Sequence, residues 1–403
     1  MEGVLLIRFF EAESEREWVK MKTQLWIFGL PEERLKALKL LRVLGFRAVT
    51  IGKNEEAVAD IVREGLTAHV VLGSFSVDKD DLQGEEYLAR RLDGTPVKWF
   101  GSGCPNNPRV REESLNLVRE AASIEGVGAV ILDGIRFASP GEGIESFMTC
   151  FCDECRRKAA DFGYDMSQME TSLHGILNSI KGLTPAVLSS MMKWASPIDL
   201  LHLLMRFPGV LEWLRFRADC IAEHVGDVRK VVRSTNARCR LGAYLFTPSL
   251  SYLVGQDYIR LSRLLDYVEP MIYRTGNGVA CLNFEVAKMA ADMYEYGSSL
   301  DQAEIQRFLF NLLGIDAEPG ANIGKLREGI TFGIVESEAR KALNMVEASK
   351  FIPILFLDDP FLVESVCGAA AAGAKNLSFF RFSEAAENAV KTVAEILKEG
   401  KSD

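Results

Sequence analysis

Asp133 is the carboxylate best placed to do chemistry in this sequence. It lies in the apolar run 127–137 (VGAVILDGIRF), which has the character of a β-strand. Apolar surroundings raise the pKa of a carboxyl group, which suits a general acid or base. Side chains alternate along a strand, so Asp133 and Arg136 reach one site only if the strand ends or bulges near Gly134. A structural aspartate that pairs with Arg136 or caps a loop is the alternative.

Glycoside hydrolysis would need a second carboxylate beside Asp133. In this reaction one acid protonates the leaving oxygen, while the other carboxylate attacks or activates water. Asp358 and Glu384 are the candidates, each close to the end of a predicted strand. Asp359 before Pro360 is typical of a helix N-cap, which leaves Asp358 as the carboxylate facing the site or as a solvated loop residue. The reaction needs no cofactor, and we find no cofactor motif in the sequence.

Cationic and aromatic side chains lie near the ends of the same predicted strands and could orient a sugar. We predict substrate contacts from Arg136, Trp99, Tyr273, Arg274 and Arg381. Phe100 and Phe246 are further aromatic residues available for stacking. Packing in the protein core is the alternative for Trp99 and Phe246.

A cluster of cysteines is the most specific local signal. Cys150, Cys152 and Cys155 form a C-x-C-x-x-C run, and Cys104 precedes them in the loop GCPNNP. Loops that follow the third and fourth strands of a barrel are neighbours, so four thiolates from these loops could close a tetrahedral structural zinc site. Buried thiols without a ligand and a redox-active thiol of low pKa are the alternatives.

Short β-type runs alternate with helical stretches, a pattern typical of parallel α/β folds. We expect eight strands, at residues 24–29, 47–51, 68–73, 127–137, 240–246, 267–273, 351–357 and 376–382. Eight such units predict a single (β/α)8 TIM barrel over residues 1–403, with catalytic groups at the carboxyl ends of its strands. A doubly wound sheet is the alternative, although no strand–GxGxxG–helix signal appears.

Two long insertions interrupt the predicted barrel. Residues 138–210, after the fourth strand, carry the cysteine run and apolar helices that could form a lid or a dimer surface, which leaves a homo-oligomer open. Residues 282–350, after the sixth strand, have a helical pattern, with a short strand conceivable at 330–335. Residues 1–20 could add a strand and turn before the barrel.

A few polar residues fit the protein interior rather than a site. Glu269 would lie two pleats below Tyr273, so we interpret it as a buried structural carboxylate. We interpret His69 and His202 as core residues because they lie in apolar runs, and the two remaining histidines, His174 and His224, as surface residues.

Composition narrows the class of protein. The 403 residues are 48% hydrophobic and 26% charged, as in ordinary globular proteins. The net charge of −9 without a basic stripe argues against binding to nucleic acids or to anionic membranes. The sequence shows no signal peptide and no uncharged apolar run of about 18 residues. Eight cysteines are too few for a disulfide scaffold. We therefore expect a soluble, cytoplasmic protein.

Parts of the sequence resemble known glycoside hydrolases. The run 130–140 (VILDGIRFASP) resembles the "DYIRFP"-like strand-four motif of glycosyl hydrolase-like families. The stretches 255–258 (GQDY) and 265–273 (LDYVEPMIY) are similar to their "GQD…D-x-V-x-P-M-x-Y" stretch. The four cysteines resemble the zinc site of glycoside hydrolase family 42 β-galactosidases. The resemblance implies a glycoside-hydrolase-type TIM barrel that holds zinc.

One departure from family 42 limits what the resemblance implies. Those enzymes carry an Asn-Glu pair at the end of strand four and a glutamate nucleophile on strand seven, whereas this sequence offers Asp133 and no Asn-Glu pair. We therefore do not expect β-galactosidase activity. Asp133 looks more like the strand-four nucleophile of α-galactosidase-type or α-fucosidase-type barrels, although it could equally be the acid.

Together these features predict a glycoside hydrolase that acts on a small oligosaccharide or glycoside. The alternative is a carbohydrate-binding or scaffold protein built on an inactive barrel, because no second carboxylate is unmistakable. A metal-dependent lyase or hydrolase is a third interpretation. In the first two cases the expected partner is a carbohydrate.

Overall fold

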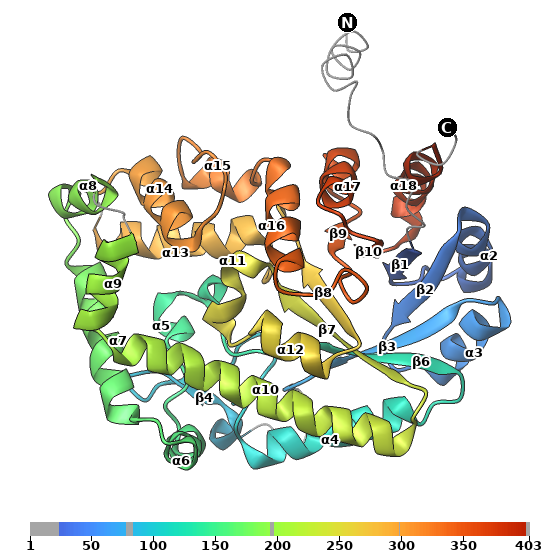
Figure 1. The fold of residues 1–403 in the computed structure, drawn as a ribbon, viewed down its shortest axis with the longest axis horizontal. Helices are drawn as coiled ribbons and strands as arrows, with labels where there is room; N and C mark the ends of the chain where they lie inside the picture. The colour runs from blue at the N-terminus through green and yellow to red at the C-terminus, as the bar shows by residue number, and fades with distance from the viewer. Residues whose placement is uncertain (1–23, 78–83, 194–196, 298, 400–403) are drawn as a thin grey trace, which may run out of the picture.

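The chain forms a closed barrel of eight parallel strands, in the order β1-β10-β9-β8-β7-β6-β3-β2 (Figure 1). The computed structural model describes residues 24–77, 84–193, 197–297 and 299–399. The strands are β1 Gln24–Phe28, β2 Phe46–Ile51, β3 Thr67–Gly73, β6 Val127–Asp133, β7 Arg240–Phe246, β8 Tyr267–Met271, β9 Ile354–Phe356 and β10 Asn376–Phe380. The predicted (β/α)8 TIM barrel is confirmed. The extra strand considered for residues 1–20 falls outside the described residues.

Helices pack around the barrel because its strands present apolar side chains outward as well as inward. Ile27, Val49 and Val70 are all fully buried. The surrounding helices are α2 Arg34–Leu44, α3 Glu55–Arg63, α4 Pro108–Ala122, α10 Gly209–Thr235, α12 Tyr258–Leu264, α17 Leu362–Ala371 and α18 Glu387–Glu399. The long helix α10 runs beside α4 and α12 (Figure 1). Among the described residues, no helix combines the length and apolarity that crossing a membrane requires.

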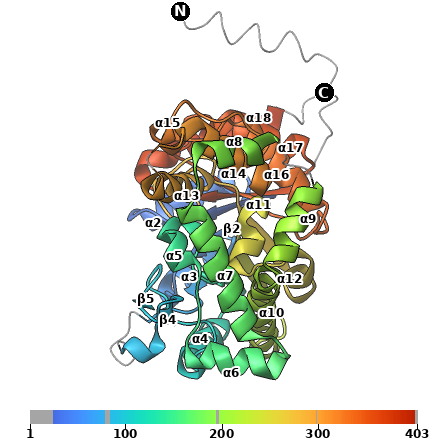
Figure 2. The ribbon, with the colours of Figure 1, turned by 90° about the vertical axis from the view of Figure 1, so that its left-hand side faces the viewer.

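The segment after β6 is helical. It contains the 3-10 helix η3 Pro140–Glu142 and the helices α5 Ile144–Phe147, α6 Asp153–Phe162, α7 Met166–Lys181, α8 Pro185–Lys193 and α9 Pro197–Arg206. In Figures 1 and 2, α8 and α9 lie on the side of the molecule away from β1 and β2. A small antiparallel hairpin that we did not predict, β4 Ala89–Arg90 and β5 Pro96–Val97, lies between β3 and α4.

The segment after β8 is also helical, with α13 Leu282–Tyr296, α14 Gln302–Leu313, α15 Ile323–Glu328 and α16 Gly333–Leu343. The strand considered at residues 330–335 is wrong, because α16 begins at Gly333. Ile334 and Val335 are buried from this helix, and Glu336 pairs with Arg340 one turn later. The predicted count of eight barrel strands is therefore unchanged.

The fourth barrel strand ends earlier than its apolar run. β6 stops at Asp133, and Gly134 has a φ of +63°, a conformation that glycine adopts without strain. This turn meets the condition under which Asp133 and Arg136 can both lie at the carboxyl ends of the strands. We call this end of the barrel its mouth.

Two of the four histidine predictions are wrong. His69 is in the core and His174 is exposed, as predicted. His224, predicted at the surface, is fully buried on α10, because its ring bonds Arg111 Nε at 3.2 Å and Ser114 Oγ at 3.0 Å. His202, predicted in the core, is exposed on α9. The interpretation of Glu269 as buried is confirmed, since it is 0% exposed.

Candidate functional site

Asp133 lies at the mouth of the barrel as the last residue of β6, in register with Gly73 of β3. Its side chain is half-buried, and its Oδ1 accepts a hydrogen bond of 2.7 Å from the backbone N–H of Gly134. Burial raises the pKa of Asp133, whereas the Gly134 hydrogen bond and the charge of Arg136 act in the opposite direction. Asp133 is thus a carboxyl group that holds a proton more readily than a solvated aspartate.

Arg136 is a buried cation beside Asp133. It is 2% exposed, and its guanidinium carbon lies 4.6 Å from the ring centre of Trp99 and 4.8 Å from that of Phe246. Its Nη1 donates to the Phe137 carbonyl at 2.9 Å. Arg136 and Asp133, both in the described part of the chain, form no direct salt bridge. The alternative of a structural aspartate paired with Arg136 therefore has no support in the geometry.

Phe100 is the aromatic residue open to a ligand on this side of the mouth. Its side chain is 54% exposed, whereas the neighbouring Trp99 is fully buried beneath Arg136. A sugar ring would therefore meet Phe100 before Trp99, which we had expected to contact substrate.

Backbone strain is concentrated in loops near the mouth. Phe100, Ala280 and Arg381 have φ angles of +47°, +71° and +76°, and they follow β3, β8 and β10. Such conformations cost non-glycine residues free energy and gather at functional sites.

Aromatic rings lie on the opposite side of the barrel mouth. Phe28, Phe356 and Phe380, which we call the aromatic floor, are half-buried at the ends of β1, β9 and β10. The rings of Phe28 and Phe380 stack at 4.8 Å, and those of Phe356 and Phe380 meet at 5.3 Å. Tyr273 packs 4.5 Å from Phe356 and is 4% exposed, so it supports the floor from below. An apolar platform of this kind suits the flat face of a sugar.

Asp358 and Arg381 lie next to the aromatic floor. Asp358 Oδ2 is 3.7 Å from Arg381 Nη1, and the side chains are 55% and 68% exposed. The strand order places β9 and β10 on the far side of the ring from β6, so this pair follows strands opposite the one that ends in Asp133. Glu384, the other candidate for the second carboxylate, does not belong to this pair. It lies in the 3-10 helix η5 Glu384–Ala386 and lines a hollow of about 340 Å³ beside α2.

Arg274, which we expected to contact substrate, is used within the protein. Its Nε and Nη2 donate to the carboxylate of Asp359 at 2.9 and 2.5 Å, and its Nη1 donates to the Ile330 carbonyl at 2.5 Å. The prediction that Asp359 is an N-cap with Pro360 at the first helical position is wrong, because α17 begins at Leu362. The buried pair instead fastens together the loops after β8 and β9.

Two acids near Arg136 were not singled out in the sequence. Burial lowers the pKa of Arg136, whereas the charges of the fully buried Glu285 and of Glu142, half-buried in η3, act in the opposite direction. Glu285 accepts hydrogen bonds from Ser139 Oγ at 3.0 Å and Ala280 N at 2.9 Å, and also from Gly141 N. Glu285 is therefore a structural link, whereas Glu142 makes no hydrogen bond through its carboxylate within the described chain. No local motif distinguishes either acid in the sequence.

The four predicted cysteines converge. The Sγ atoms of Cys104, Cys150, Cys152 and Cys155, the four-cysteine cluster, all lie within 4.8 Å of one another. Cys104 Sγ is 3.4, 3.5 and 3.7 Å from the sulfurs of Cys152, Cys155 and Cys150. These distances exceed a disulfide bond of about 2.05 Å, and all four cysteines are free. The cluster joins the loop after β3 to the segment after β6.

The geometry of the four-cysteine cluster fits a metal ion. Zinc–sulfur bonds of about 2.3 Å give a tetrahedron with sulfur–sulfur edges of about 3.8 Å, close to the three separations around Cys104. Backbone and side-chain N–H groups point at the sulfurs, from Arg90 N to Cys150 at 3.3 Å and from Asn106 Nδ2 to Cys155 at 3.3 Å. Such hydrogen bonds are typical of thiolates that bind metals. The cluster could therefore hold a metal ion.

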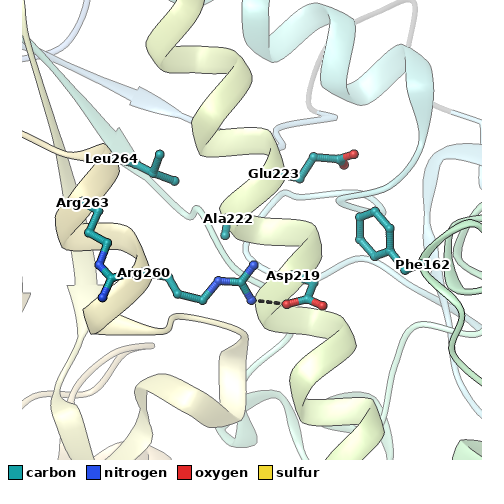
Figure 3. Close-up of a pocket in the computed structure, with 7 residues that line it drawn as sticks. All are labelled: Phe162, Asp219, Ala222, Glu223, Arg260, Arg263 and Leu264. Atoms are coloured by element: carbon teal, nitrogen blue, oxygen red, sulfur yellow. Dashed lines mark hydrogen bonds and ion pairs between the residues drawn. The ribbon is translucent and has the colours of Figure 1, made fainter.

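A larger hollow, of about 540 Å³, lies outside the barrel between α10 and α12 (Figure 3). Its charged groups are largely paired. Asp219 bonds Arg260 and accepts from Tyr164 Oη at 2.6 Å, while Glu223 pairs with Lys158 and Arg111. With its acids neutralised in this way, the hollow offers no free carboxylate for catalysis.

Comparison with known proteins supports the same fold. No family model and no curated protein matches the sequence. The PgaB (BpsB) glycoside hydrolase domain from Bordetella bronchiseptica superposes with a TM-score of 0.53 at 10% identity, covering 94% of this chain and 99% of that one. The catalytic domain of β-amylase from Paenibacillus polymyxa superposes with a TM-score of 0.51 at 10% identity, covering 90% and 92%. The chain thus adopts the (β/α)8 barrel fold found in these glycoside hydrolases.

Proposed function

We propose that this protein is a glycoside hydrolase that acts on a small oligosaccharide or glycoside at the barrel mouth. The observation that carries the proposal is the position of Asp133, a half-buried carboxyl group of raised pKa at the end of β6. The aromatic floor and the exposed ring of Phe100 lie on opposite sides of the same mouth. A sugar chain that crosses the mouth would pass over Asp133 between them.

Asp133 would act on the glycosidic bond while other groups orient the sugar. Burial and the absence of a direct salt bridge favour the protonated form needed by a general acid, and the nearby charge of Arg136 favours the carboxylate needed by a nucleophile. Asp358 is a candidate for the second catalytic carboxylate, because its side chain and that of Arg381 are exposed to solvent and follow strands opposite β6. We propose Asp358 as the second carboxylate, with Arg381 holding a sugar hydroxyl group.

The matched variants Asp133→Asn, Asp358→Asn, Glu142→Gln and Glu384→Gln test these assignments. Wild-type protein is first screened on a panel of aryl glycosides, and the variants are then compared on an alkyl glycoside of the best sugar, whose leaving group needs a proton. We expect kcat/KM to fall by about 10²–10⁴ for Asp133→Asn and for Asp358→Asn, as for the loss of a general acid or base. A loss of this size in Glu142→Gln instead of Asp358→Asn would assign the second carboxylate to Glu142. Glu384→Gln, which lies beside α2, should retain wild-type activity. Activity of Asp133→Asn within tenfold of wild type would exclude Asp133.

The leaving group distinguishes the two roles of Asp133. If Asp133 is the acid, Asp133→Asn should lose little activity on a dinitrophenyl glycoside, whose leaving group needs no proton, and much activity on an alkyl glycoside. If it is the nucleophile, both substrates should lose activity equally.

An inactive carbohydrate-binding barrel is the second candidate. It is favoured if wild-type protein cleaves no glycoside on the panel but binds oligosaccharides in calorimetric titrations. Phe100→Ala should then weaken binding, because the exposed ring is available for stacking on a sugar.

We also propose that the four-cysteine cluster holds structural zinc. Four thiolates at tetrahedral spacing and a mostly buried position are typical of closed zinc sites rather than catalytic ones with an open position. Zinc there would crosslink the loop after β3 to the segment after β6. Metal analysis of protein purified without chelators should give one zinc per chain.

A further inference from the structure

Arg217, on α10, is a buried cation for which the described residues supply no carboxylate. It is 0% exposed, and its guanidinium carbon lies 4.4 Å from the ring centre of Trp213, 4.9 Å from that of Phe137 and 5.2 Å from that of Phe147. Nη2 donates to the Ala138 carbonyl at 2.7 Å. Within the described residues, Nε and Nη1 have no hydrogen-bond partner and no acid forms a salt bridge with this guanidinium.

Such a charge needs compensation. Removing a guanidinium from water is costly, and the rings around Arg217 accept no hydrogen bond in the ring plane, so that Nε and Nη1 are left without an acceptor among the described residues. An arginine cannot escape the cost by losing its proton. A negative charge near Arg217 is therefore expected.

The four-cysteine cluster is a source of negative charge close to Arg217, because the guanidinium packs against Phe147 and Trp213, and Trp213 bonds the residue directly before Cys150. Burial lowers the pKa of Arg217, and the positive charge of Arg136 lowers it further, whereas the charges of Cys150, Cys155 and Cys220 raise it. Cys220 lies outside the four-cysteine cluster, so a metal bound there would not hold it as a thiolate, and burial raises the pKa of its thiol to about 12. Cys150 and Cys155 belong to the cluster.

The complex of a divalent metal ion with four thiolates carries a net charge of −2. We propose that Arg217 is the counter-charge of such a metal–tetrathiolate centre and couples it to the loop that carries Arg136. The inference rests on the metal that we propose for the cluster, and it is independent of the proposed hydrolase activity.

The hydrogen bonds around Arg217 show how the coupling would work. Nη2 binds Ala138, which lies two residues after Arg136. Trp213, one of the three rings around Arg217, donates its Nε1–H to the carbonyl of Thr149 at 3.0 Å, and Thr149 directly precedes Cys150. One turn of α10 thus contacts both the cysteine run and the loop after β6. Arg217 is a positioning residue in this scheme, because it acts through these two segments.

Arg217→Met tests the proposal, since methionine keeps an apolar side chain of similar length and removes the charge. Arg215→Met, on the exposed side of the same helix, is the matched control. Zinc affinity is measured by competition with a chromophoric chelator, and site geometry by the absorption of the cobalt-substituted protein. We expect Arg217→Met to raise the zinc dissociation constant at least tenfold, Arg217→Lys to raise it less, and Arg215→Met to leave it within twofold of wild type.

Stability with and without metal separates charge from packing. If Arg217 balances the metal centre, Arg217→Met should lower the Tm of the zinc-loaded protein but leave the Tm of the chelated, reduced protein equal or higher. An equal loss of Tm in both states would mean that Arg217 only packs, and would overturn the proposal. So would unchanged zinc affinity, or a wild-type protein that binds no zinc or cobalt.

If Arg217→Met does not fold, Arg217→Lys and Arg217→Gln replace it, because they differ from each other in charge. The lysine variant should then bind zinc more tightly than the glutamine variant. Equal affinities of these two variants would overturn the proposal.

Discussion

Two buried arginines on different sides of the barrel are neutralised in different ways. Arg274, after β8, is 5% exposed and forms a two-pronged ion pair with Asp359. Arg217, beneath the loop after β6, is 0% exposed and has no carboxylate partner among the described residues. Both lie against aromatic rings, at 4.9 Å from Phe361 for Arg274. The loops after β8 and β9 therefore contain their own counter-charge, whereas for Arg217 we propose that the thiolates of a metal-bound four-cysteine cluster provide it.

Glu269 is a buried ionisable group whose charge can be neutralised in a third way, by protonation. It is fully buried inside the barrel, and neither carboxylate oxygen has a hydrogen-bond partner in the described part of the chain. Burial raises the pKa of Glu269 and so favours the neutral, protonated form of the group. An arginine has no such option, which is why the contrast between Arg274 and Arg217 points to metal rather than to protonation.

Removal of the metal should produce the largest effect on the region after β6. Chelation under reducing conditions should lower the free energy of unfolding by more than about 4 kcal/mol, the range typical of losing a structural metal. Cys155→Ser should reproduce the loss, and chelator should then have no further effect. Denaturant unfolding followed by circular dichroism measures both. A wild-type protein whose stability is insensitive to chelator would contradict a structural metal and remove the contrast between the two regions.

Asp359→Ala should produce a comparable but smaller loss on the other side. It leaves Arg274 buried without its partner, which costs about 3–5 kcal/mol. Asp358→Ala is the matched control, because its exposed contact with Arg381 is worth less than about 1 kcal/mol. Both variants should lose as much stability on addition of chelator as the wild-type protein does. Urea unfolding of the two variants gives the comparison, and equal losses would show that Arg274 does not depend on Asp359.

Glu269→Gln should produce the smallest effect at pH 5, and its difference from wild type should grow as the pH rises. The pKa of Glu269 is raised in the folded state, so unfolding releases a proton at any pH between the unfolded value of 4.5 and the folded value. Wild type should therefore lose stability relative to the variant as pH rises above about 4.5, by up to about 1.4 kcal/mol per pH unit. Urea unfolding of both proteins at pH 5, 6, 7 and 8 measures this slope. Parallel stability curves would mean that Glu269 is not held neutral.

Much of the fold could be predicted from periodicity. All eight barrel strands overlap the predicted apolar runs, because a strand buried on both faces is rich in apolar residues. Their ends were harder to predict. The run 127–137 continues to Phe137, but β6 stops at Asp133, where Gly134 turns the chain. The hairpin of β4 and β5 was missed since its strands have only two residues each.

The candidate site divides in the same way. The sequence by itself determined that Asp133 lies in the fourth strand and that four cysteines lie in loops after adjacent strands, because these positions follow from local pattern and barrel order. Only the tertiary structure decided that Asp359 belongs to Arg274, that Glu384 lies beside α2, that Phe100 rather than Trp99 is exposed, and that Arg217 lacks a carboxylate. These outcomes depend on which loops and helix faces touch, and contacts between residues far apart in the chain leave no mark on local hydrophobic spacing.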